Sequence, residues 1–274
     1  MSDLMKIFSN VEAMQAMHSL NNINAKIGLH SLRLASGKRI NTSEEDPAGF
    51  QLARSLERRR RGLEVALQNV SNAKNVMNIA EGGYQNIMDI LQTIKEKATQ
   101  ASDFSLSDTQ RSAINEQVTA LISEIDDIIT ETTFNNTALI NGSFANANFH
   151  TGEGASDELL ITLQNADSSA LSLSNISVST AASASAAISS SSSAIDSLSD
   201  YIQDVGEYKV RLSSKEQALS VAITNTEAVR SNIEDADFAQ EQMEVMKLQI
   251  LQQTAVSSLV QANTAPQVVL QLFR

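Results

Sequence analysis

The sequence of 274 residues contains no cysteine and no tryptophan, and only two prolines, Pro47 and Pro266. The lack of cysteine excludes disulfides, thiolate metal sites and cysteine nucleophiles. Aromatic residues make up only 4% of the chain, so the apolar 42% is mainly Leu, Ile, Val, Met and Ala, which suits helix-on-helix packing. The segment between the prolines lacks the residue that most reliably breaks a helix. The composition therefore favours a mainly α protein with long helices.

Positive charge is also scarce, since 20 Lys and Arg stand against 32 Asp and Glu, a net charge of -12. A nucleic-acid-binding surface needs a net positive face, so we expect no nucleic-acid partner. One basic run is an exception. Because it follows Glu57, we interpret it as a solvated face or a set of donors for inter-subunit ion pairs. Its members are Arg58, Arg59, Arg60 and Arg61.

No stretch of the sequence approaches the ~20 consecutive apolar residues that a membrane span needs. The first thirty residues lack a basic start followed by an uninterrupted apolar run. We therefore expect neither a cleaved secretion signal nor insertion into a membrane.

The residues that usually carry catalysis are isolated in this sequence. His18, His30 and His150 each stand without a metal-ligand partner at useful spacing, and no glycine-rich phosphate loop occurs. The pair Asp126 and Asp127 is more typical of surface charge than of a metal site. We expect no enzyme activity, no metal and no cofactor.

A seven-residue apolar repeat begins at Leu63 and continues over six heptads, which predicts one long helix. At ~1.5 Å per residue this helix would extend for roughly 60 Å. One set of positions is Leu63, Val70, Met77, Tyr84, Leu91 and Ala98. The other set, three residues later, is Ala66, Ala73, Ala80, Ile87, Ile94 and Ala101.

Two further helical stripes follow the long one, and three such helices can pack as one elongated antiparallel bundle. Asp46 before Pro47, and Ser107 with Gln110, have the spacing of helix N-caps. The second stripe is Ile114, Val118, Leu121, Ile125 and Ile128. The third stripe is Leu198, Val205, Leu212, Leu219 and Ile233.

A small β region is predicted between residues 144 and 178. Residues 159–163 form a short apolar run, and Leu171 and Leu173 alternate with serine. Residues 168–199 include 15 serines. We interpret this segment as an exposed hairpin edge and a helix start rather than as a surface for O-glycosylation.

Each end of the sequence carries a wide apolar stripe at helical spacing, with little inside its own domain to cover it. Isolated striped helices are marginal in water, so we predict that these faces are buried by assembly. The predicted inter-subunit packing residues are Ile7, Val11, Met14, Ile23, Ile27, Leu248, Leu251, Leu259, Leu270 and Phe273.

Two blocks of motifs stand at opposite ends of the chain. The first block is LRLASGKRIN at residues 32–41 and EDPAG at residues 45–49, followed by Asn69, the AEG triplet at 80–82 and TFN at 133–135. The second block is IEDADFA at 233–239, ILQQ at 250–253, QAN at 261–263, Pro266 and LQLFR at 270–274. The two blocks resemble bacterial flagellin, and together they are highly specific because they occur in order.

The resemblance implies a mainly α fold, a long antiparallel helical bundle or coiled coil with a small β-hairpin region and a discontinuous terminal-helix domain. Residues 1 to about 43 and 239–274 would form the inner coiled pair of a filament. Residues 44–238 would form the outer bundle, with the β region at about 144–178. The first block is similar to the flagellin turn that joins the two. Its residues are Ser36, Gly37, Arg39, Ile40, Asp46 and Gly49.

The function implied by the resemblance is that of a structural subunit that self-assembles into the helical flagellar filament, external or periplasmic. The implied partners are copies of itself, an export chaperone on the C-terminal helix, the flagellar type III export apparatus, and filament cap and hook-junction proteins. Glu234 and Asp235 are candidate inter-subunit partners of the basic run. The alternatives are a hook–filament junction protein and a secreted coiled-coil effector.

The resemblance also extends to a region for innate recognition. Flagellins that are recognised by the innate receptor carry an arginine where this chain, matched through Gln92, has Thr93. Glu116 resembles a second receptor-contact position that is retained. The resemblance implies that recognition is weakened at this region.

Overall fold

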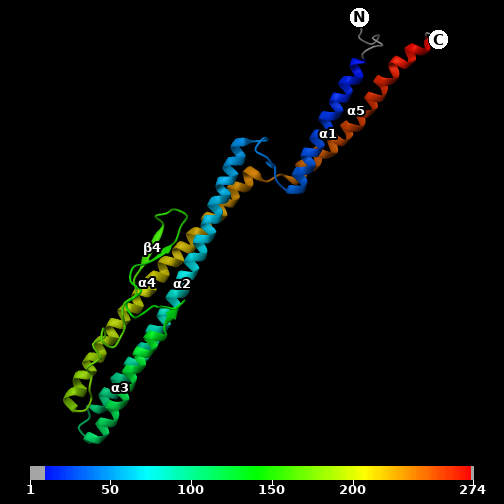
Figure 1. The fold of residues 1–274 in the computed structure, drawn as a ribbon. Helices are drawn as coiled ribbons and strands as arrows, with labels where there is room; N and C mark the ends of the chain where they lie inside the picture. Colours follow the sequence, from blue (N-terminus) through cyan, green and yellow to red (C-terminus); the bar gives the residue numbers. More distant parts are fainter. Residues whose placement is uncertain (1–9, 273–274) are drawn as a thin grey trace. The chain divides into compact units, whose positions relative to one another are not determined.

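The structure is a computed structural model that describes residues 10–272, with side chains described for residues 10–264. The helices are α1 (Val11–Ser36), α2 (Pro47–Ala101), α3 (Asp108–Glu131), α4 (Ala181–Glu234) and α5 (Phe238–Leu272) (Figure 1). The strands are β1 (Thr133–Phe134), β2 (Thr137–Ala138), β3 (Ala147–His150) and β4 (Glu158–Ile161). The fold is mainly α with a small β region, as predicted.

The chain divides into two compact units. The bundle unit is Arg59–Thr224, and the terminal unit combines the residues up to Arg58 with those from Asn225 onward. Helices α2 and α4 contribute to both units. The predicted domain boundaries lay at residues 43 and 239, outside these helices. The assignment of one part to the inside and the other to the outside of a filament stays a prediction.

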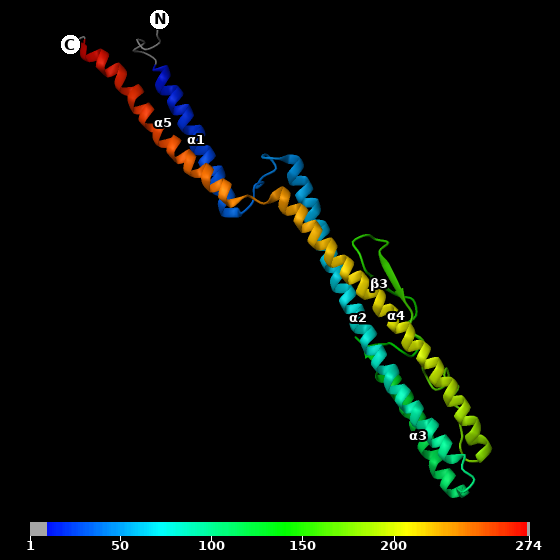
Figure 2. The same ribbon diagram turned by 180° about the vertical axis from the view of Figure 1, so that it is seen from behind.

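The core of the bundle unit follows the predicted heptads. Every one of the twelve heptad positions between Leu63 and Ala101 is at most 5% exposed. Helix α3 adds Ile114, Val118 and Ile125 to the same core, and α4 adds a stripe from Leu198 to Leu219. Helices α2 and α4 run side by side in both views (Figures 1 and 2). The strict repeat keeps one face of α2 turned inward over its whole length in this unit.

Tyr84 ties the middle of α2 to the segment that follows β4. Its hydroxyl donates a hydrogen bond of 2.6 Å to the backbone carbonyl of Gln164, and its ring lies 6.0 Å from that of Tyr201. Burial raises the pKa of Tyr84 well above its ordinary value, so the hydroxyl keeps its proton and remains a donor.

The predicted helix starts are confirmed. Helix α2 begins at Pro47, and the backbone N–H of Gly49 donates to Asp46 Oδ1 at 2.9 Å. Helix α3 begins after Ser107, which forms a full capping box with Gln110. Each cap satisfies backbone donors that the first turn of a helix leaves unpaired.

The β region consists of two antiparallel hairpins. In the first, Asn135 and Asn136 have positive φ angles of 49° and 63°, as the two-residue type I′ turn requires. This hairpin precedes the predicted β region. In the second, β3 pairs with β4 from Ala147 opposite Ile161 to His150 opposite Glu158. The second hairpin lies within the predicted residues.

The prediction of a strand around Leu171 and Leu173 is wrong. This segment forms turns, in which Ser172 has a φ of 58° and the N–H of Leu173 donates to the carbonyl of Ser168 at 2.7 Å. Both leucines are nevertheless buried. The alternation of leucine with serine here therefore corresponds to a compact turn that buries both leucines, and not to a strand.

Helix α4 begins within the serine-rich segment, as predicted, but residues 168–180 form turns and bends and not the predicted hairpin edge. Most serine hydroxyls of this helix that form hydrogen bonds donate to the carbonyl four residues earlier, as Ser192 does to Ile188 at 2.9 Å. Ser191 differs, because it is fully buried and its hydroxyl has no hydrogen-bond partner among the described residues.

Replacement of Ile87 by alanine tests the heptad core. Ile87 is fully buried, so Ile87→Ala should lower the free energy of unfolding by about 2–5 kcal/mol, the range for large cavities in packed cores. Ile79→Ala is the matched control, because Ile79 lies on the same helix and is 39% exposed. Denaturant unfolding followed by circular dichroism measures both. Equal losses would contradict the assigned core face.

Candidate functional site: the terminal helix pair and its turn

Helices α1 and α5 lie side by side and antiparallel, which both views show (Figures 1 and 2). Near the start of α1, the side-chain amide of Asn10 donates to the carbonyl of Ala262 at 2.8 Å. Further along, Gln252 Nε2 donates to Asn24 Oδ1 at 2.7 Å. These bonds join segments that are more than 200 residues apart in the sequence.

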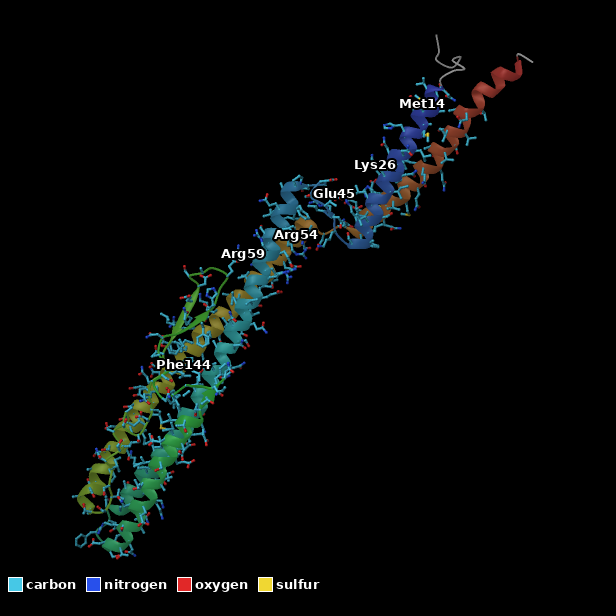
Figure 3. All side chains as sticks on the ribbon, in the orientation of Figure 1. Met14, Lys26, Glu45, Arg54, Arg59 and Phe144 are labelled. Carbon is cyan, nitrogen blue, oxygen red and sulfur yellow. The ribbon has the colours of Figure 1, made fainter. Side chains whose placement is uncertain are left out.

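The helix pair leaves much of its apolar surface in water. No residue of α1 is buried, and Met14, which is labelled in Figure 3, is 65% exposed. Ile250 on α5 is also 65% exposed. Further exposed apolar side chains are Val11, Met17, Leu32, Met243, Met246, Leu251, Val256 and Val260. A surface of this kind on a two-helix layer indicates an interaction site.

The predicted packing residues occupy different environments in this pair. Val11, Met14 and Leu251 are exposed, whereas Leu248 is only 5% exposed and is thus covered within the chain. The remaining described members are half-buried, namely Ile23, Ile27 and Leu259. Ile7 and Phe273 lie outside the described residues, and so does the side chain of Leu270.

The turn after α1 pairs with the segment between α4 and α5. Gly37 ends α1 with a φ of 70°, and its N–H donates to the carbonyl of Arg33 at 2.9 Å. The carbonyl of Gly37 accepts from the N–H of Ala236 at 2.9 Å. The N–H of Arg39 donates to the carbonyl of Glu234 at 2.6 Å. Residues 37–40 thus meet residues 233–236, which brings together the two blocks noted in the sequence.

Two further residues of the predicted turn have packing roles. Ile40 is 2% exposed, and a Cβ on Gly49 would lie 2.8 Å from the Ile40 Cδ1 atom and 2.4 Å from Asp46 Oδ2. A larger residue at position 49 would therefore collide with both. Ser36 donates only weak bonds to the carbonyls of Arg33 and Lys38, at 3.4 Å each.

An ion-pair cluster centred on Glu234 lies against this turn. Lys38 Nζ donates to Glu234 Oε1 at 2.6 Å, and Arg230 donates to Oε2 at 2.5 Å. Arg230 also pairs with Glu227 at 2.6 Å. Burial opposes charge on Glu234, but the hydrogen bonds from Lys38 and Arg230 outweigh it and hold its pKa below the usual range. The carboxylate therefore stays charged and joins α4 to the turn.

A second cluster, which the sequence analysis missed, joins α1 to the start of α5. His30 Nδ1 contacts Glu241 Oε2, and Arg33 lies 3.5 Å from Glu241 and 3.4 Å from Glu45. Glu241 is 8% exposed. The available signal was the spacing of His30 and Arg33, which places both on one face of a helix.

Neither a metal cluster nor a membrane span is present in the part of the chain that the structure describes. That part contains no group of three or more His, Asp or Glu side chains able to hold a metal. Its helices also lack any stretch that is both long and apolar enough to cross a bilayer.

Comparison with known protein families covers most of the chain. The family of the bacterial flagellin N-terminal helical region matches residues 7–145, and that of the bacterial flagellin C-terminal helical region matches residues 188–273. The chain belongs to the bacterial flagellin family. It is a structural protein of the flagellar filament and not an enzyme.

Relatives of this flagellin match it over nearly its whole length. Flagellin FlaB1 of Treponema pallidum is 30% identical, covering 98% of this chain and 100% of the relative. The flagellar filament core protein flaB2 of Brachyspira hyodysenteriae is also 30% identical, with the same coverage. These relatives place the protein in the flagellar filament.

A solved structure shares the fold. It is described as a flagellar hook-associated protein from Vibrio parahaemolyticus, with a TM-score of 0.59 at 14% identity. The match covers 70% of this chain and 100% of that one. At this identity the likeness shows the fold alone, so it does not favour the junction-protein alternative.

The basic run of this flagellin forms ion pairs within its own chain. Arg59, labelled in Figure 3, pairs with Glu153 at 2.9 Å, and Arg60 pairs with Glu64. The carboxylate of Glu234 is likewise held within the chain, whereas Arg58 and Asp235 are exposed. A role of these residues and Arg61 in ion pairs between subunits stays a prediction. The ion pairs within the chain would compete with such pairs.

The predicted receptor region lies on α2 and α3. Gln92 is exposed, and Thr93 is partly buried with its hydroxyl donating to the carbonyl of Asp89 at 3.0 Å. Glu116 is exposed on α3. The weakened innate recognition stays a prediction.

Replacement of Glu234 by glutamine tests the cluster at the turn. At pH 7, Glu234→Gln should speed exchange of the amides of Arg39 and Ala236 about tenfold, because loss of the charge removes roughly 1.4 kcal/mol. Since folding lowers the pKa of Glu234, its stabilising effect is present at neutral pH. That effect is lost as the pH falls from about 4.5, its ordinary value, through the lowered pKa.

Hydrogen exchange from pH 7 to pH 3, corrected for intrinsic rates, measures this effect. The variant and the parent should converge at the acid end. Glu244→Gln is the control, because Glu244 forms an ion pair with Lys247 at the surface of α5. A difference that is unchanged at pH 3 would show that the carboxylate charge is not responsible.

Proposed function

We propose that α1 and α5 form the assembly surface of this flagellin and are buried inside the filament, while the part of the chain between them packs outside. In residue terms, 1–43 and 239–274 form the inner part and 44–238 the outer part. The observation that carries the proposal is the absence of any buried residue in α1, although its sequence has an apolar stripe at helical spacing.

The energetics support burial by other copies. Full burial of one large apolar side chain contributes about 1.5–3 kcal/mol. The pair exposes many such side chains, among them Met14, Met17, Ile250 and Val260. Repeated contacts between unlike surfaces of identical subunits do not close on themselves, so they generate an open helical filament.

The exposed apolar stripe of this flagellin would be in contact with water until the subunit assembles, unless another protein binds it. We propose that an export chaperone covers α5, and that the subunit travels through the flagellar type III export apparatus to meet the filament cap and hook-junction proteins. The exposed apolar side chains of α5, such as Met243, Met246 and Ile250, support this step.

Deletion of residues 239–274 tests the chaperone proposal. The deletion removes the proposed binding helix, so binding of the chaperone to the chain should fall below detection in a pull-down assay, with the full chain as the control. Chaperone binding at the level of the full chain would contradict the proposal.

Negative-stain microscopy of the purified chain, after a salting-out step that promotes polymerisation, tests self-assembly. Long helical filaments are the expected result. Rings or dispersed monomers would instead favour the junction-protein or effector alternatives.

The substitution Ile250→Glu tests the assembly surface itself. The monomer should remain folded because Ile250 is exposed. Polymerisation should weaken, with a rise of about tenfold or more in critical concentration, because burial of an unpaired carboxylate costs well over 1.4 kcal/mol. Sedimentation of polymer across a concentration series measures the change.

The control introduces the same charge at a neighbouring polar position of α5. Gln249 is also exposed, so Gln249→Glu should shift the critical concentration much less. If both variants polymerise like the parent chain, α5 is not buried in the filament.

A further inference from the structure

Phe104, in the loop between α2 and α3, is a large apolar side chain almost entirely in water. It is 95% exposed, well above the 65% of Met14 and Ile250. Asp103 precedes it, and Asp108 follows with a side chain that is 98% exposed. Asp108 also lies 3.5 Å from the guanidinium of Arg111, which neutralises part of the charge of the loop. The loop therefore presents a single aromatic ring between two carboxylates and keeps a net negative charge.

Buried hydrogen bonds brace this loop. Arg111, which is only 7% exposed, donates from Nε to the carbonyl of Ala101 at 2.9 Å and from Nη2 to that of Asp103 at 2.6 Å. The N–H of Ser105 donates to Asp103 Oδ1 at 2.8 Å and holds the pKa of that carboxyl below its usual range. A loop that is already ordered loses little entropy on binding, which favours a role as a docking element.

An apolar groove lies elsewhere on the same bundle unit, between β4 and α4. Its volume is about 400 Å³. Its lining residues are Leu159, Val210, Arg211, Ser214, Lys215 and Ala218. Val210 is 67% exposed at this groove. Among the described residues, neither Arg211 nor Lys215 forms an ion pair with a carboxylate. Arg211 instead lies over the ring of Tyr208, 5.9 Å from its centroid. The groove therefore combines an apolar lining with two cations that form no ion pair.

The loop and the groove are far apart within one chain. The ion pairs Lys74 with Glu216 and Lys209 with Glu81 place the groove beside residues 74–81 of α2. Ala101, where α2 ends, is 20 to 27 residues further along, which at 1.5 Å per residue is roughly 30–40 Å. Phe104 therefore cannot fill the groove of its own chain.

We infer that Phe104 of one subunit inserts into the Leu159–Val210–Ala218 groove of a second copy, with Asp103 and Asp108 facing Arg211 and Lys215. The acidic loop and the basic groove are opposite in charge, each has an apolar centre, and both belong to this chain. Because they lie at different levels of the same unit, the contact is head to tail and continues from copy to copy. The inference rests on the self-assembly proposed above.

Cysteine cross-linking tests this contact without background, because the natural chain has no cysteine. A chain with both Phe104→Cys and Val210→Cys is polymerised and mildly oxidised. Disulfides need Cα atoms within about 7 Å, so no bond can close within one chain. A ladder of covalent oligomers on a non-reducing gel is the expected result.

The matched control pairs Phe104→Cys with Val65→Cys, at an exposed apolar position on α2 of the same unit. It should give no ladder. An equal ladder in the control, or filaments of the first variant that yield only monomer on the gel, would overturn the inference while leaving self-assembly intact. Failure of the parent chain to form filaments would instead refute the proposed function.

A second variant tests the contact between Phe104 and the groove if the cysteine substitutions impair polymerisation. Phe104→Ala should raise the critical concentration about tenfold or more, since a phenyl ring would no longer be buried. Phe134→Ala, at a ring that is 40% exposed on β1, should change it less than about twofold. Equal critical concentrations for Phe104→Ala and the parent would overturn the inference.

Discussion

The backbone pairing of residues 37–40 with residues 233–236 is the contact on which the terminal unit depends. The bonds from Arg39 to Glu234 and from Ala236 to Gly37 fix where the first helix ends and where the last begins. With these ends held, α1 and α5 can run antiparallel in register. The surrounding side chains protect the pairing, because Ile40 fills the space beside Gly49 and the buried carboxylate of Glu234 is held by Lys38 and Arg230.

The charged and the apolar side chains of the terminal helix pair differ in whether they find partners within the chain. In the terminal unit, the buried or half-buried ions of the Glu234 and Glu241 clusters lie at the turn end of the helix pair. Exposed apolar side chains lie along the whole pair, from Leu32 and Met243 near these ions to Met14 and Val260 at the other end. The ions at the turn end are thus paired within the chain, whereas apolar surface along the whole pair is still exposed.

Periodic signals in the sequence predicted the fold well, and non-periodic ones did not. The heptads of α2 and the caps at Asp46 and Ser107 were predictable because they depend on local spacing and on one neighbouring turn. The turns around Leu171 were not, because serine alternation has the same pattern in a strand and in a tight turn. The pairing of His30 with Glu241 joins residues 211 apart, and no local rule connects them.

The distance along the chain between paired segments also has a kinetic consequence. Helices α2 and α3 are joined by a short loop and can meet early, whereas the terminal unit joins residues 37–40 to segments about 200 residues away. The entropic cost of closing a loop rises slowly with its length, so we expect the terminal helix pair to form after the contact between α2 and α3. A chain that has not yet paired α1 with α5 therefore lacks the surface that we propose for assembly.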